Sequence, residues 1–101
     1  MTKSEDVRWD AKYTGGGYAI IPFTQGYWGL YTYMKFPENP EWAIAHSGYL
    51  DIKGDHIKLG AVAAALNGLP QEAQFQSAEQ AKELVSETCN EKLTWEGTVL
   101  Y

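Results

Sequence analysis

Apolar and polar residues alternate one by one near the start of the chain. Residues 7–13 follow this pattern without a break, and a period of two is typical of a half-buried β-strand. Residues 14–17, Thr-Gly-Gly-Gly, predict a tight turn because glycine accepts positive φ angles. Residues 18–24 are rich in β-branched and aromatic side chains and predict a second strand. Pro22 within it has no N–H to donate, which favours an edge strand or a β-bulge.

The longest predicted strand covers residues 27–36, and its two faces differ in character. Because strand side chains alternate between faces, one face carries an apolar row that only Thr32 interrupts: Trp28, Leu30, Met34 and Phe36. The other face carries three tyrosines: Tyr27, Tyr31 and Tyr33. A Pro-containing break follows at residues 37–40, and residues 42–47 and 49–53 predict a further pair of short strands.

The apolar period then changes from two to about 3.6, which indicates helices. The Ala-rich residues 59–66 predict one helix. Ser77 is the expected N-cap of a second helix, with Gln80 as its capping-box partner and an end near Asn90. The buried stripe of this second helix is expected to consist of Ala78, Ala81, Leu84, Val85 and Thr88. Residues 93–101 predict a last strand.

Together these elements predict an α+β domain. Its antiparallel sheet has about five to six strands, because the early connections are short, and both helices pack on one face of the sheet. The 101 residues leave room for a single domain, expected over residues 7–101 after a flexible tail of residues 1–6. The sheet face without helices is then left for solvent or for a partner.

Charge narrows the range of partners. The formal net charge is −5, and the eight basic residues include a single arginine. Nucleic acid phosphates are bound by clustered Lys and Arg, so the composition disfavours direct nucleic acid binding and is compatible with a basic protein partner. Residues 1–8 lack the apolar core of a secretory signal, and no apolar run reaches the roughly 20 residues that cross a bilayer. We therefore expect a cytoplasmic protein without membrane contact.

Four glutamates recur at a spacing of four residues along the second predicted helix: Glu79, Glu83, Glu87 and Glu91. Residues 71–101 contain six acidic residues against two lysines, so most of the negative charge lies there. Four helical residues rise about 6 Å, so the carboxylates are expected to form a row along one side. Like charges at this spacing destabilise a helix by a few tenths of a kcal/mol per pair. The row is either a solvated helix face or a docking stripe for a basic groove.

Tyr27, Tyr31 and Tyr33 form the second candidate surface. Tyrosine contributes a large contact area and loses little rotamer entropy, which suits a binding patch. An exposed tyrosine face would serve a protein partner or a small ligand such as a sugar. The alternative is a second buried layer.

No catalytic or metal-binding pattern emerges from the sequence. Asp51, Asp55 and His56, with His46 upstream, match no recognised metal spacing, and turn formation accounts for both aspartates. Cys89 is the only cysteine, which excludes an internal disulfide and a multi-cysteine zinc site. Because no nucleophile, base and orienting group can be placed together, we expect a protein that is not an enzyme and has no metal or cofactor.

The chain resembles the small acidic inhibitors that bacteriophages direct against host defences, the anti-CRISPR and anti-restriction proteins. The resemblance rests on size, the acidic row Glu79–Glu91, a compact aromatic sheet and the lack of catalytic groups. It implies a protein partner with a basic surface that normally holds nucleic acid, with the glutamates as the electrostatic contacts. The alternatives are a toxin-neutralising immunity protein and a small-ligand or sugar-binding module that uses the tyrosine face.

Overall fold

The structure is a computed structural model that describes residues 7–22, 26–33, 48–58 and 71–99. Seven strands, a 3-10 helix and an α-helix follow one another in these residues. They are β1 (Val7–Tyr13), β2 (Gly16–Pro22), β3 (Trp28–Tyr33), β4 (Gly48–Leu50), β5 (His56–Lys58), η2 (Gln71–Ala73), β6 (Gln74–Phe75), α3 (Ala78–Thr88) and β7 (Glu96–Val99).

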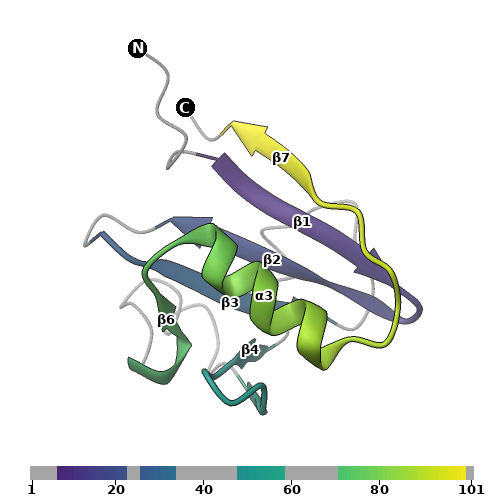
Figure 1. Cartoon of the computed structure of the whole chain (residues 1–101), viewed down its shortest axis with the longest axis horizontal. Helices are drawn as coiled ribbons and strands as arrows, with labels where there is room; N and C mark the ends of the chain where they lie inside the picture. Colours follow the sequence, from purple (N-terminus) through teal and green to yellow (C-terminus); the bar gives the residue numbers. More distant parts are fainter. Residues whose placement is uncertain (1–6, 23–25, 34–47, 59–70, 100–101) are drawn as a thin grey trace.

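The strands form one antiparallel sheet in the order β5-β4-β3-β2-β1-β7, with β6 paired to β3 beside this path. α3 lies across one face of the sheet over β2 and β3 (Figure 1). The predicted turn between the first two strands is present, and Gly15 adopts a φ of 93° that favours glycine there. β7 returns to pair with β1, from Val7↔Val99 to Asp10↔Glu96. The predicted α+β class with an antiparallel sheet is confirmed, but the described residues form seven strands where about five to six were predicted.

Buried side chains lie on both faces of the central strands. Ile20 and Leu30 are partners in register and pack in the cluster that includes α3. On the opposite face Ala19 is the partner of Tyr31, and Tyr31 is the partner of Tyr49. The predicted division into an apolar row and a tyrosine row is therefore confirmed for residues 27–33, whereas Met34 and Phe36 lie outside the described residues. The core extends to both sides of the sheet.

Ser77 is the N-cap of α3, as the sequence predicts, whereas Gln80 bonds to the residue before the cap and not to Ser77 itself. Ser77 has an extended backbone, and its side chain accepts a hydrogen bond from the backbone N–H of Gln80 at 3.1 Å. The Gln80 side chain accepts from the backbone N–H of Gln76 at 2.8 Å, one residue before the cap. These bonds satisfy backbone donors that have no partner within the helix.

The buried stripe of α3 matches the prediction at most positions. Ala78, Ala81 and Val85 are buried, and Leu84 packs at the edge of the same cluster. Thr88, which was expected to be buried, is exposed instead, and its hydroxyl donates to the Leu84 carbonyl oxygen at 2.8 Å. Such a bond from a threonine hydroxyl to the carbonyl of the preceding turn is common within helices.

Three parts of the predicted architecture either differ from the structure or lie outside the described residues. Within the described residues there is one α-helix, and the other predicted helix, residues 59–66, lies outside them, as does the predicted tail of residues 1–6. β5 was not anticipated as a separate strand. Pro22 does not mark an edge strand, because β2 lies between β1 and β3. Pro22 ends β2, so its missing N–H affects only the last position of the strand.

Candidate functional site

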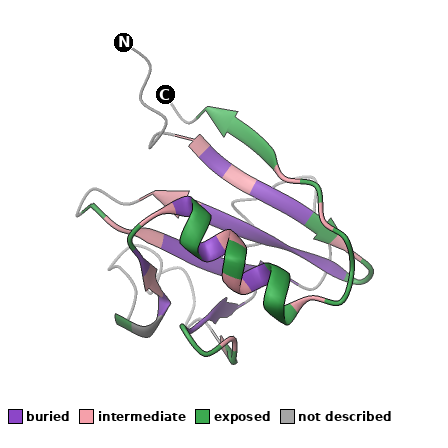
Figure 2. Ribbon diagram, in the orientation of Figure 1, coloured by how far each residue is buried: buried purple, intermediate pink, exposed green. Residues whose placement is uncertain are grey.

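The outward face of α3 carries three of the predicted acidic residues. Glu79, Glu83 and Glu87 are all exposed, and we call them the acidic stripe. Each step of four residues rises about 6 Å and turns about 40° around the helix axis, so the stripe is about 12 Å long. It lies on the side away from the buried Ala81 and Val85. Figure 2 shows the same division, with the outward side of α3 exposed and the side toward the sheet buried.

No ion pair in the described part of the chain involves the acidic stripe. The last turn of α3 contains no basic residue. Lys82 lies on the same helix, but its Nζ is 3.7 Å from the centre of the Trp9 ring and 5.9 Å from the centre of the Trp95 ring. This cation–π contact directs the ammonium group toward the aromatic rings. The stripe therefore presents its negative charge outward.

Glu91, the fourth member of the predicted row, does not lie on the helix. α3 ends at Thr88, and Cys89 has an extended backbone. The Glu91 carboxylate accepts hydrogen bonds from the Thr14 backbone N–H at 3.1 and 3.0 Å and from the Thr14 hydroxyl at 3.1 Å. Glu91 therefore ties the segment after α3 to the β1–β2 turn. The expectation of a helical row of four glutamates is wrong, because the spacing of four continues beyond the helix end.

The tyrosine row is not an exposed binding face. Tyr31 is 1% exposed and Tyr33 is 2% exposed, while Tyr27 is half-buried beside them. The Tyr33 ring lies against Gly17, where an added Cβ would come within 2.7 Å of the tyrosine hydroxyl. Burial raises the pKa of both buried phenols, and the nearby Asp10 charge contributes further at Tyr33. The expected exposed contact surface is wrong, because these rings belong to the core.

A buried ion pair lies on the same face of the sheet as Tyr33. Arg8 and Asp10 have side chains that are 7% and 8% exposed, and the Arg8 terminal nitrogen lies 3.0 Å from Asp10 Oδ1. The Arg8 Nε also donates to both carboxylate oxygens at 3.1 Å, and the Tyr33 hydroxyl donates to Oδ1 at 3.5 Å. This pair is not among the residues predicted from the sequence. The sequence does contain an indication of the pair. Two opposite charges lie two residues apart on a predicted strand, which places both side chains on one face.

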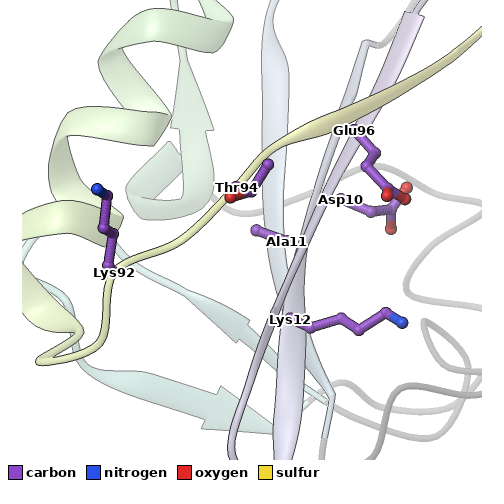
Figure 3. Close-up of a pocket in the computed structure, with 6 residues that line it drawn as sticks. All are labelled: Asp10, Ala11, Lys12, Lys92, Thr94 and Glu96. Carbon is purple, nitrogen blue, oxygen red and sulfur yellow. The ribbon is translucent and has the colours of Figure 1, made fainter.

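A polar hollow of about 300 Å³ lies where β7 separates from β1 (Figure 3). Pairing with β1 ends at Asp10↔Glu96, and the segment before β7 then leaves the sheet. Figure 3 shows Asp10, Lys12 and Glu96 extending to one side of β1, whereas Lys92 lies on the side of α3. Asp10 already has the Arg8 guanidinium as its partner. The charges of this hollow do not converge on one point.

The polar cluster around the β4–β5 turn is explained by turn chemistry. Asp51 Oδ1 accepts hydrogen bonds from the backbone N–H groups of Lys53 at 3.0 Å and Asp55 at 2.8 Å. His56 lies against Gly48 at the start of β5, and His46 lies outside the described residues. In the part of the chain that the structure describes, no group of three His, Cys, Asp or Glu side chains is arranged to hold a metal ion.

Comparisons of the chain with protein-family models, with curated proteins and with solved structures found no match. Among the described residues, no helix is both long enough and apolar enough to span a bilayer.

Proposed function

We propose that the protein binds a basic surface on another protein through the outward face of α3. In this role it is an anti-CRISPR-like inhibitor that covers a nucleic-acid-binding surface of a host defence complex in the cytoplasm. It performs no chemistry on its partner and needs no cofactor. The observation that carries the proposal is the acidic stripe, which is exposed and has no ion-pair partner in the described part of the chain.

The charge density of the stripe supports occlusion and not imitation of a nucleic acid duplex. Its carboxylates follow one another every 6 Å or so along the helix. Duplex DNA carries one charge per about 1.7 Å of its axis. The charge density of the stripe is thus several times lower than that of DNA. The stripe attracts a basic groove on the partner and orients the protein as it approaches. The bulk of the bound domain then keeps nucleic acid out of the groove. Tyr31 and Tyr33 belong to the buried cluster on the sheet face opposite α3 and are not part of the proposed contact.

The helix itself gives a reason to look for a function in the stripe. Glu87 lies in the last turn, where the negative end of the helix dipole disfavours a carboxylate. Glu83 and Glu87 repel each other across one helical turn. Lysine at either position would stabilise the isolated helix more than glutamate does. An acidic contact for a partner explains the choice of glutamate at both positions.

The experiment compares two charge-matched double variants in affinity capture from a host lysate, followed by binding measurements with the purified captured protein. One variant carries Glu83→Lys and Glu87→Lys. The control carries Asp55→Lys and Glu96→Lys. Both residues are also exposed and lie outside the acidic stripe, Asp55 in the β4–β5 turn and Glu96 on β7. Both variants change the net charge equally. We expect the helix variant to weaken affinity by about tenfold, mainly through slower association at low salt, and the control to bind like the parent chain.

Competition with nucleic acid tests the proposed mode of action. Nucleic acid that the partner normally binds should compete with this protein for the partner. The proposal fails if the helix variant and the control bind equally well. It also fails if nucleic acid and this protein bind the partner together, and capture of a toxin that this protein neutralises would favour an immunity protein instead.

A further inference from the structure

A second hollow, of about 230 Å³, lies between the last turn of α3 and the β4–β5 hairpin. Its lining includes Tyr13, Tyr18, Thr32, Leu50, His56 and Thr88. The turn after β4 approaches the helix end closely, since a Cβ added to Gly54 would come within 2.9 Å of Thr88 Oγ1. Pockets for drug-sized ligands have volumes of about 300–1,000 Å³. The hollow is therefore suited to a molecule with only a few heavy atoms.

Thr32 is the unusual member of the lining. It is 7% exposed, and its Oγ1 is buried without a hydrogen-bond partner among the residues that the structure describes. Thr32 interrupts the apolar row of β3 on the face toward α3, where its neighbour Leu30 is fully buried. A buried hydroxyl without a partner destabilises the fold, and valine would fill the same space without this cost. A group that enters the hollow and bonds to Oγ1 would supply the missing partner.

The surroundings of the hollow favour a positive charge. Tyr13 and Tyr18 line it with their rings 5.1 Å apart and tilted by 38°. Burial raises the pKa of both phenols, and the Cys89 thiol and the Glu91 carboxylate raise it further. The Glu91 carboxylate is held in place by Thr14. The adjoining end of α3 is the negative end of its dipole and has no basic residue in its last turn.

We propose that this hollow binds a small organic ammonium ion that carries an O–H or N–H group. The ammonium lies over the tyrosine rings, in a cation–π contact that a negative environment strengthens. The O–H or N–H group bonds to Thr32 Oγ1. The negative charge of Glu91 and the negative helix end disfavour an anion. A neutral molecule would gain nothing from this negative environment. This site is separate from the acidic stripe and does not depend on the proposed function.

The test is a titration of the isotope-labelled 101-residue chain with choline, followed by nuclear magnetic resonance of the backbone amides. Dimethylbutanol has the shape of choline without its charge and serves as the matched ligand, and sodium chloride controls for ionic strength. Choline should shift the amides of Tyr18, Thr32 and Thr88, and dimethylbutanol should bind at least tenfold more weakly. Equal binding of the two compounds, or shifts that sodium chloride reproduces, would overturn the proposal.

Two variants at one position separate binding from folding. Thr32→Val should raise the thermal unfolding midpoint by several degrees, because it removes a buried polar atom without a partner, and should weaken choline binding at least tenfold. Thr32→Ser keeps the hydroxyl and should retain binding within a fewfold of the parent chain. The proposal is wrong if Thr32→Val binds choline as the parent chain does, or if Thr32→Val unfolds at a lower temperature.

Discussion

Charge reversal at the two ends of α3 should change stability in opposite directions. Glu79 lies in the first turn of the helix and Glu87 in the last. The helix dipole favours a negative charge at the first position and a positive charge at the second. We therefore expect Glu79→Lys to destabilise the protein and Glu87→Lys to stabilise it, although both changes alter the net charge equally.

The neighbours of each residue set the size of the two effects. At position 87, lysine replaces a repulsion with Glu83 by an attraction in the favoured order, a gain of a few tenths of a kcal/mol. Removing the unfavourable interaction with the helix dipole brings the total to about 1 kcal/mol. At position 79, lysine gains attraction to Glu83 but adds repulsion from Lys82 three residues on. These two terms nearly cancel, so the loss of the dipole interaction leaves a destabilisation of about 0.5 kcal/mol.

Thermal unfolding followed by circular dichroism measures both effects. For a domain of this size, 1 kcal/mol shifts the midpoint by about 4–8 °C. Glu87→Lys should raise the midpoint by about that amount at low salt, and Glu79→Lys should lower it by about half as much. Both shifts should shrink at high salt because the charges are exposed to screening. Shifts of the same sign, or shifts that salt does not reduce, would refute the electrostatic explanation.

Three further predictions concern the buried tyrosines, the helix cap and the edge strand β7. Burial raises the pKa of Tyr18, Tyr31 and Tyr33 above the value of about 10 in the unfolded chain. Their contribution to stability is therefore complete below pH 10 and is lost as the pH rises toward the folded-state pKa, so the urea midpoint should be constant from pH 8 to about pH 10 and fall above it. Ser77→Ala removes the hydrogen bond from the Gln80 N–H and should lower the free energy of unfolding by about 1 kcal/mol in urea titrations. Ser77→Asp keeps an acceptor for this bond and should retain the stability of the parent chain. Gly97→Ala places a Cβ 2.9 Å from the Trp9 ring and should also cost about 1 kcal/mol, with loss of the tryptophan near-ultraviolet dichroism as its signature.

Local patterns were sufficient to predict the elements whose determinants are close in sequence. The bounds of β1 follow from an alternation that runs from Val7 to Tyr13. The β1–β2 turn follows from its glycines, and the start of α3 follows from Ser77 and Gln80. The partition of β3 into two faces also follows, because it depends only on the alternation of side chains along a strand.

Features that depend on distant parts of the chain could not be predicted in this way. Alternation assigns Tyr31 and Tyr33 to a face but does not say whether that face is exposed, and in the fold both are buried beside Ala19 and Tyr49. A spacing of four residues also carries no information about where a helix ends. For this reason the predicted acidic row included Glu91. In the structure Glu91 bonds to Thr14, which is 77 residues away in the sequence.

The two proposals concern residues that violate local rules of stability at the same end of α3. Glu87 places a negative charge at the negative end of the helix dipole, and Thr32 buries a hydroxyl without a partner in the hollow beside Thr88. Such violations are expected where a sequence serves a function as well as a fold. The proposals remain separable by experiment. Thr32→Val should abolish the choline response and leave capture of the basic partner unchanged. Glu87→Lys should weaken that capture and lower choline affinity only a fewfold, through the added positive charge at the helix end. If either substitution removes both activities while the chain stays folded, the two surfaces form one site, and the small cation would then represent a lysine side chain of the partner.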